Sequence, residues 1–248
     1  MARNSVSSPN SFRHAVNAEV MWEAYPDKLI GLIQELRPKS ILDIGGGRNP
    51  KLSLSQAQEL CERYAVLDVD QGELDLADDG YETILGDASN PPEITKGQFD
   101  FVFSRMVAEH VADGRAFHEG VYSMLRPGGV AFHFFPTLYS LPFLANWLIP
   151  NAVADRVLDL IAPRDRDEQD KFPPHYSWTF GPTNRQIARI ESVGFEIVEY
   201  TAGFGHRYYN NLPVIRTVGA KLHDALARRP VWSLSSYASL VVRRPLTD

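Results

Sequence analysis

From Lys39 onward, short apolar runs alternate with segments whose residues favour helices. Each run is rich in Val, Ile, Leu and aromatic residues, which is typical of strands buried on both faces. The runs lie at 40–44, 64–69, 81–86, 99–104, 129–135, 195–200 and 237–242. Helices are expected between them, at Leu52–Tyr64, Gly114–Leu125 and Pro182–Val193. This alternation predicts an α/β fold, in which helices cover both faces of a parallel sheet.

Two insertions interrupt the alternation, at 136–174 and 204–230. A connection that long inside a compact domain is usually functional or a small subdomain. We expect both to lie at one end of the sheet as a lid over a pocket, with a dimer interface or a packing arm as alternatives. The chain then forms a single domain, with an N-terminal helical arm at 1–38 and a core at 39–135 and 175–248.

Composition excludes several classes of protein. The 248 residues include 25 Lys and Arg against 31 Asp and Glu, a net charge of −6, which argues against a nucleic-acid partner. The single Cys61 excludes a disulfide framework and a thiolate zinc site. No run approaches the roughly 18 apolar residues of a transmembrane helix, and residues 1–16 lack a signal-peptide core. We therefore expect a cytoplasmic protein.

The strongest local motif is Ile-Leu-Asp-Ile-Gly-Gly-Gly-Arg-Asn-Pro at 41–50, where a strand runs into three glycines. Glycine lets a ligand approach the backbone closely, so the motif favours a nucleotide-like ligand, with a plain strand–helix turn as the alternative. A dinucleotide fingerprint starting at Gly45 needs glycine where Pro50 stands. Asp43 suits a cationic ligand group such as an amino-acid ammonium, or it organises the turn by bonding its amides.

Two further carboxylates follow the next two strands. Asp68 can accept both hydroxyls of a ribose, unless it or Asp70 instead caps the following helix. Asp87 can accept from an adenine amine while Ala88 offers its N–H, or Asp87 forms an Asx turn.

These motifs, with Phe-Asp-Phe-Val-Phe-Ser-Arg-Met-Val-Ala-Glu-His-Val at 99–111, Leu-Arg-Pro-Gly-Gly at 125–129 and Val-Gly-Phe-Glu-Ile at 193–197, resemble class I S-adenosylmethionine-dependent methyltransferases. The resemblance implies a Rossmann-like seven-stranded sheet of order 3-2-1-4-5-7-6 with strand 7 antiparallel. It also implies S-adenosylmethionine as cofactor and S-adenosylhomocysteine as product. The cofactor-binding residues that it implies are Asp43, Gly45, Gly46, Gly47, Asp68, Asp87, Ala88 and Ser104. The motif departs from the family where Asn49 replaces its third glycine.

Glu109 and His110 follow the fourth strand of the expected sheet, near the expected position of the transferred methyl group. Imidazole has a pKa suited to general-base work near neutrality, so His110 is a candidate base, unless it merely packs at the sheet edge. Relatives with Glu-x-x-Glu-His here bind Mg²⁺, but Met106 stands in place of the first carboxylate. A metal is therefore not favoured, although Glu109 and His110, or a different site completed by His133, remain compatible with Mg²⁺.

Acceptor contacts are expected from two loops that combine aromatic and polar side chains. One carries His175, also a candidate base, with Tyr176 and Trp178, and the other carries His206 and Tyr208. The stretch 171–178 resembles methyltransferases associated with bacterial polysaccharides, which implies O-methylation of a sugar or glycoside hydroxyl on a small molecule or oligosaccharide. The alternatives are a hydrophobic or lipid-linked acceptor beneath an apolar lid at 138–149, or a non-catalytic binding protein. The sequence leaves a homodimer open.

Overall fold

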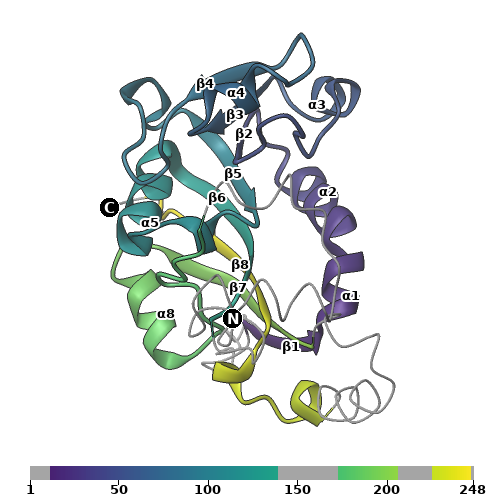
Figure 1. The fold of residues 1–248 in the computed structure, drawn as a ribbon, viewed down its shortest axis with the longest axis vertical. Helices are drawn as coiled ribbons and strands as arrows, with labels where there is room; N and C mark the ends of the chain where they lie inside the picture. Colours follow the sequence, from purple (N-terminus) through teal and green to yellow (C-terminus); the bar gives the residue numbers. More distant parts are fainter. Residues whose placement is uncertain (1–11, 139–172, 206–224, 247–248) are drawn as a thin grey trace, which may run out of the picture.

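The computed structural model describes residues 12–138, 173–205 and 225–246, which build one mixed sheet flanked by helices (Figure 1). The strands are β1 (Arg13–Asn17), β2 (Ser40–Ile44), β3 (Arg63–Asp68), β4 (Glu82–Leu85), β5 (Phe99–Arg105), β6 (Leu125–Pro136), β7 (Glu196–Phe204) and β8 (Tyr237–Arg243). Their order is β1-β7-β8-β6-β5-β2-β3-β4. β8 is antiparallel to both of its neighbours, and the other pairs are parallel.

Seven of these strands confirm the expected topology. From β4 to β7, the order is 3-2-1-4-5-7-6 with the seventh strand antiparallel. The structure adds β1 outside β7, with His14 beside Thr201 and Val16 beside Gly203. The N-terminal arm is therefore not purely helical, because its first described segment extends the sheet.

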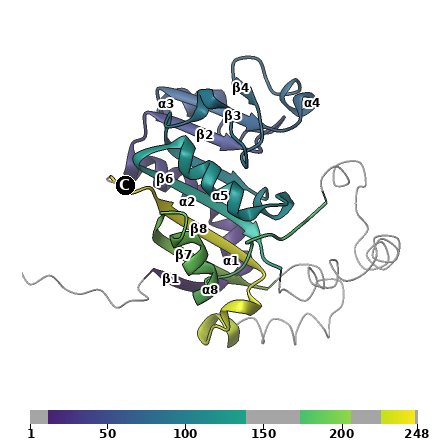
Figure 2. The same ribbon diagram turned by 90° about the vertical axis from the view of Figure 1, so that its left-hand side faces the viewer.

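The helices form a layer on each face of the sheet (Figures 1 and 2). α5 (Gly114–Met124) and α8 (Asn184–Glu191) cover one face, while α1 (Ala18–Glu23), α2 (Tyr25–Leu36) and α3 (Leu54–Leu60) cover the other. A short α4 (Gln71–Leu74) follows β3, and 3-10 turns lie at Glu93–Thr95, Ala108–His110 (η2) and Trp232–Leu234.

Two helices begin later than the sequence pattern indicates. α3 starts after Ser53, whose side chain accepts from the Gln56 amide in a capping box, while the preceding Leu52 is buried. α8 likewise starts after Thr183, which accepts from the Gln186 amide. Capping residues, rather than apolar periodicity, set both starts.

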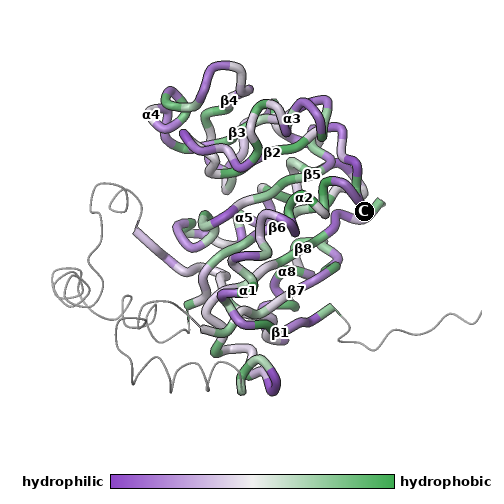
Figure 3. Tube along the Cα trace, turned by 90° about the vertical axis from the view of Figure 1, so that its right-hand side faces the viewer, coloured by the Kyte–Doolittle hydropathy of each residue, from purple (hydrophilic) through white to green (hydrophobic). Residues whose placement is uncertain are grey.

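Side chains of the central strands alternate between two apolar clusters. Phe101 and Phe103 pack on the α2 face with Tyr25, whereas Val102 packs on the α5 face with Phe117. Figure 3 shows hydrophobic colouring along the central strands. This alternation decides which helix layer each residue at the end of a strand will face.

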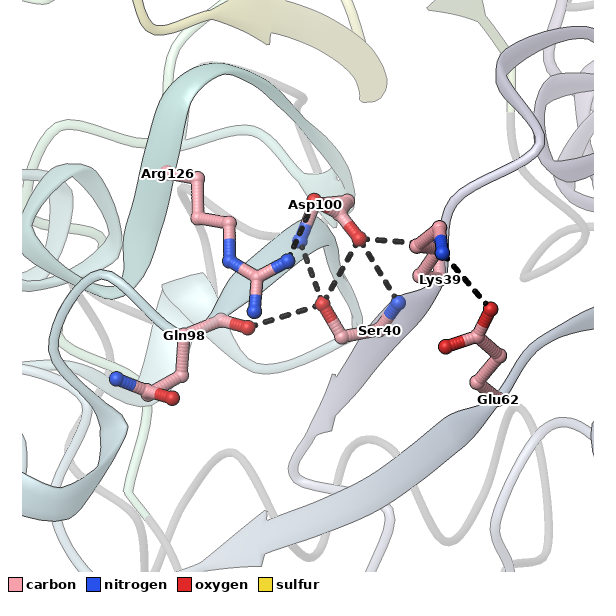
Figure 4. Close-up of polar contacts among 6 residues, drawn as sticks. All are labelled: Lys39, Ser40, Glu62, Gln98, Asp100 and Arg126. Atoms are coloured by element: carbon pink, nitrogen blue, oxygen red, sulfur yellow. Dashed lines mark hydrogen bonds and ion pairs between the residues drawn. The ribbon is translucent and has the colours of Figure 1, made fainter.

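A polar network fixes β2 beside β5 at the edge of the sheet where both strands begin (Figure 4). One Asp100 carboxylate oxygen accepts from the amides of Lys39 and Ser40, each at 2.9 Å, and from the Ser40 hydroxyl. Arg126 pairs with the other oxygen at 3.2 Å. These bonds hold the register in which Ile44 lies beside Ser104 at the opposite edge.

We expect two helix glycines to respond oppositely to alanine. A Cβ at Gly120 in α5 would lie 1.9 Å from the Ala88 carbonyl oxygen, whereas nothing lies within 4 Å of a Cβ at Gly31 in α2. Gly31→Ala should raise the free energy of unfolding by about 0.5–1 kcal/mol through helix propensity. Gly120→Ala should lower it by about 1–3 kcal/mol through overpacking. Urea unfolding followed by circular dichroism measures both, and equal stabilisation would contradict the packing of α5 on the 87–88 turn.

Candidate active site

The turn after β2 adopts a backbone that requires glycine. Gly45 and Gly47 have φ angles of +72° and +45°. A Cβ at Gly45 would also lie 2.4 Å from the side chain of Val107, which follows β5. The turn is therefore packed against the segment that carries the candidate base.

Asp43 organises this turn from inside the sheet. Its buried carboxylate accepts from the Tyr64 hydroxyl and from the Lys51 amide, each at 2.8 Å. Burial raises the pKa of Asp43 to about 6, against the effect of these hydrogen bonds. The turn-organising alternative thus describes Asp43 in this structure, and its contact with a ligand ammonium remains a prediction.

Asn49, which stands where the family has its third glycine, fits into the turn through local hydrogen bonds. The Asn49 amide donates to the Gly46 carbonyl at 2.9 Å, which closes the turn. Arg48 forms two hydrogen bonds with the Glu73 carboxylate, at 2.6 and 2.8 Å. Asn49 therefore closes the turn, and the neighbouring Arg48 links it to α4.

Asp68 lies at the end of β3, directly opposite the turn. A Cβ at Gly47 would be 3.1 Å from its carboxylate. Asp70, not Asp68, caps α4 by accepting from two amides, which leaves Asp68 to accept from the Asp70 amide at 3.0 Å. The intervening Val69 has 52% of its surface exposed, and the sequence reasoning missed it. An exposed aliphatic side chain beside a carboxylate suits a nucleoside. The base can pack on the aliphatic side chain, and the ribose hydroxyls can hydrogen-bond to the carboxylate.

The turn after β4 places Asp87 and Ala88 differently from each other. Asp87 is exposed and accepts from the Ser89 amide at 2.7 Å, which is the Asx turn foreseen as its alternative role. Ala88 is buried, with its carbonyl against Gly120 of α5. Adenine binding by either residue remains a prediction.

Ser104 is fully buried, and its hydroxyl lies 2.7 Å from Nδ1 of His133 on β6. Both side chains face the α5 layer, where the His133 ring lies 5.8 Å from that of His118. Burial lowers the pKa of both histidines, to about 4 for His118, so both are neutral near pH 7. The Ser104 side chain is thus bonded within the core, and cofactor contact at this position remains a prediction.

Glu109 and His110 lie in η2, immediately beyond the glycine turn. The Glu109 side chain is 3% exposed and that of His110 is 35% exposed, with 3.7 Å between Glu109 Oε1 and His110 Nε2. Within the described ranges the Glu109 carboxyl oxygens have no hydrogen-bond partner. Burial raises the pKa of Glu109 to about 8, so this carboxyl group is largely neutral at pH 7.

The loop at 173–178 is fastened to η2. The amides of His175 and Tyr176 both donate to the Glu109 carbonyl, at 2.7 and 3.0 Å, which brings the exposed His175 beside η2. Tyr176 is buried, and the Trp178 ring packs near His118 and Arg189.

The predicted contacts between the acceptor and the residues of this loop and of the two insertions remain predictions. Contacts by Tyr176, which is buried, and by Trp178, which is partly buried, stay predictions. His206, Tyr208 and most of the expected lid, residues 139–172, lie outside the described residues.

Solved structures share this fold across most of the chain. A putative methyltransferase from Bacillus halodurans matches with a TM-score of 0.53 at 16% identity, covering 89% of this chain and 98% of that one. A SAM-dependent methyltransferase from Archaeoglobus fulgidus matches with 0.53 at 14%, covering 89% and 93%. The cyclase SpnF matches with 0.53 at 15%, covering 89% and 81%, so the fold alone does not fix a reaction.

A search of curated proteins finds no sequence match. A family model described as a methyltransferase domain matches residues 42–133, the segment from β2 to β6 that carries the glycine turn, Asp68 and η2. Residues 42–133 thus match a methyltransferase domain, and the described fold is shared with SAM-dependent methyltransferases.

The residues around the turn are of the kinds that a nucleoside cofactor needs. Gly47 has no Cβ where the Asp68 carboxylate approaches, and Val69 next to Asp68 is exposed. The described residues contain no group of three or more His, Cys, Asp or Glu side chains arranged to hold a metal ion. No helix among them is long and apolar enough to cross a membrane.

We expect Glu109→Gln to change the pH dependence of stability. The folded-state pKa of about 8 lies above the ordinary 4.5, so the folded protein binds more protons than the unfolded chain between these values. Wild-type stability should therefore fall relative to the Gln variant as pH rises from about 4.5 to 8, by on the order of a few kcal/mol. Urea unfolding at pH 5 and pH 8.5 measures the difference. The exposed Glu196→Gln is the control, and parallel pH profiles for wild type and Glu109→Gln would contradict the buried neutral acid.

Proposed function

We propose that this chain is an S-adenosylmethionine-dependent methyltransferase that methylates a hydroxyl group of a sugar or glycoside, with His110 or His175 as the general base. The observation that carries the proposal is the hydrogen bond from the His175 backbone amide to the Glu109 carbonyl, which brings His175 to the 3-10 turn that carries His110, next to the glycine turn. A hydroxyl acceptor benefits from a base that removes its proton, whereas the sulfonium cofactor already carries a good leaving group. The likeness of residues 171–178 to polysaccharide-associated methyltransferases favours a sugar.

Residues at the carboxyl ends of β2, β3 and β4 would hold the cofactor. The backbone of the turn at 45–47 would contact its methionine group, and Asp68 would accept from the ribose hydroxyls. Asp87, Ala88 and the exposed Val69 would surround the adenine. When bound, S-adenosylmethionine supplies an electrophilic methyl group. The protein aligns the acceptor and takes up its proton.

His110 has surroundings that suit a proton acceptor. Its side chain is partly exposed, so an acceptor hydroxyl can reach it, while the neighbouring Glu109 is buried and mostly neutral. A mostly neutral Glu109 places little negative charge at 3.7 Å from the His110 ring nitrogen. Once His110 is protonated, ionisation of Glu109 at 3.7 Å becomes easier and stabilises the imidazolium.

A hydrophobic or lipid-linked acceptor is the second candidate, and one observation favours it. A cavity of about 460 Å³ lies between the α1–α2 layer and strands β1, β6, β7 and β8, within the size range of ligand pockets. Its lining is mainly apolar and includes Val16, Met21, Tyr25, Phe132 and Phe134. Tyr25 also contacts Arg105 at the crevice, so an apolar group in this cavity would lie near the cofactor.

The ribose assignment is tested by Asp68→Asn. Loss of a charge-assisted hydrogen bond should weaken S-adenosylhomocysteine binding by about 1.5–3 kcal/mol, which isothermal titration calorimetry measures. Asp79→Asn, an exposed carboxylate change, is the matched control and should leave affinity unchanged. Unchanged affinity in Asp68→Asn would show that the ribose binds elsewhere.

The base assignment is tested by measuring labelled-methyl transfer to extracts of hydroxyl-bearing metabolites. His110→Ala or His175→Ala should lower kcat by about 10²–10⁴-fold while S-adenosylhomocysteine affinity stays within the error of the wild-type value. His14→Ala, on the edge strand β1, controls for loss of a histidine. Full turnover in both active-site variants would mean that neither imidazole abstracts the proton.

Transfer to lipid extracts but not to sugars would favour the second candidate.

A further inference from the structure

Arg105 stands beside the glycine turn, although the sequence motifs gave it no role. Ile44 at the end of β2 lies in register with Ser104 of β5, so the next residues, Gly45 and Arg105, are neighbours at the same edge. Side chains alternate along a strand, and Arg105 therefore faces the α2 layer, as Asp43 does, while Ser104 faces α5.

Two aromatic rings hold the Arg105 guanidinium. It lies 4.8 Å from the ring centroid of Trp22 in α1 and 4.9 Å from that of Tyr25 in α2. Such stacking restrains the side chain without neutralising its charge. No carboxylate in the described part of the chain forms an ion pair with Arg105. Its Nε is buried, with no hydrogen-bond partner among those residues.

A second buried donor lies beside it. The Tyr25 hydroxyl has no hydrogen-bond partner within the described ranges, and the residue is only 3% exposed. Buried polar groups are normally hydrogen-bonded, so two such groups on side chains that pack against each other are unusual. Both can donate, which fits a ligand group that only accepts. A carboxylate is the group that a planar guanidinium binds best.

Asp43 and Arg105 place a negative and a positive charge beside the glycine turn, and an amino-acid ligand needs one of each. Asp43 and Arg105 act with opposite sign on the pKa of the same Tyr25 hydroxyl and of the Lys51 ammonium, so both charges reach the same space. The cofactor's methionine group is a zwitterion whose ammonium suits Asp43. Its carboxylate then needs a cation on the same side of the turn, and Arg105 provides one.

We propose that Arg105, together with the Tyr25 hydroxyl, anchors the carboxylate of the cofactor's methionine group. This inference rests on the cofactor site of the proposed function and assigns the part of the ligand that the family motifs left without a partner. It also gives the N-terminal helices α1 and α2 a part in cofactor binding, because they hold the guanidinium in place.

The test compares two ligands by isothermal titration calorimetry. S-adenosylhomocysteine carries the amino-acid group, whereas 5′-methylthioadenosine keeps the adenosine and the sulfur but lacks that group. Arg105→Gln should weaken S-adenosylhomocysteine binding ~10- to 100-fold, the scale of a lost charge-assisted hydrogen bond. Binding of 5′-methylthioadenosine should stay within ~2-fold, which also shows that the variant is folded. Arg105→Lys should restore part of the loss.

Two further variants sharpen the comparison. Tyr25→Phe removes only the hydroxyl and should weaken S-adenosylhomocysteine alone, by ~3- to 10-fold. Lys28→Gln removes another cation of α2, one that pairs with Glu199, and should change neither affinity.

Several results would overturn the carboxylate anchor. Equal weakening of both ligands by Arg105→Gln would mean that Arg105 only fastens α1 and α2 to the sheet. Unchanged affinity of Arg105→Gln for both ligands would place the carboxylate elsewhere. Unchanged affinity for both ligands together with a raised KM for the acceptor would assign Arg105 to an anionic acceptor. In these cases the wild-type protein still binds S-adenosylhomocysteine, so the cofactor site survives. Wild-type protein that binds neither ligand would overturn the cofactor site as well.

Discussion

The hydrogen bonds to the buried Asp43 carboxylate hold the glycine turn on which the active site depends. Tyr64 on β3 and the amide of Lys51 both donate to one of its oxygens, so the carboxylate links β2, β3 and the chain that leaves the turn. This fixes where Gly45 passes Val107 and where Gly47 passes Asp68. Burial raises the pKa of Asp43 to about 6, which shows that this organisation has an electrostatic cost.

The two faces of the sheet carry different polar groups at the strand ends next to the glycine turn. On the α2 face, Asp43 and Arg105 carry opposite charges beside the turn, which suits a zwitterion. On the α5 face, Ser104 and His133 bond each other and stay neutral within the core. The candidate bases His110 and His175 lie in η2 and in the loop bonded to it, beyond the strand ends. In the proposed function, the cofactor's amino-acid group and the base would therefore be held by different segments.

The apolar runs predicted the seven strands from β2 to β8, and the resemblance to a known family, not the periodicity, implied their order. The sequence analysis missed β1, since Arg13–Asn17 is short and mixed, and its pairing depends on β7, far away along the chain. Helix starts were misplaced where caps such as Ser53 decide them. Arg105 carried no motif signal, because its role depends on the register of a neighbouring strand and on rings about 80 residues earlier.

The most direct test of this account is a crystal structure of the protein grown with S-adenosylhomocysteine. We expect its electron density between the turn at 45–47 and the end of β3, with the ribose hydroxyls on Asp68 and the amino-acid end between Asp43 and Arg105. Density for the ligand at another place, or a crevice closed by the protein's own side chains under saturating ligand, would contradict the account.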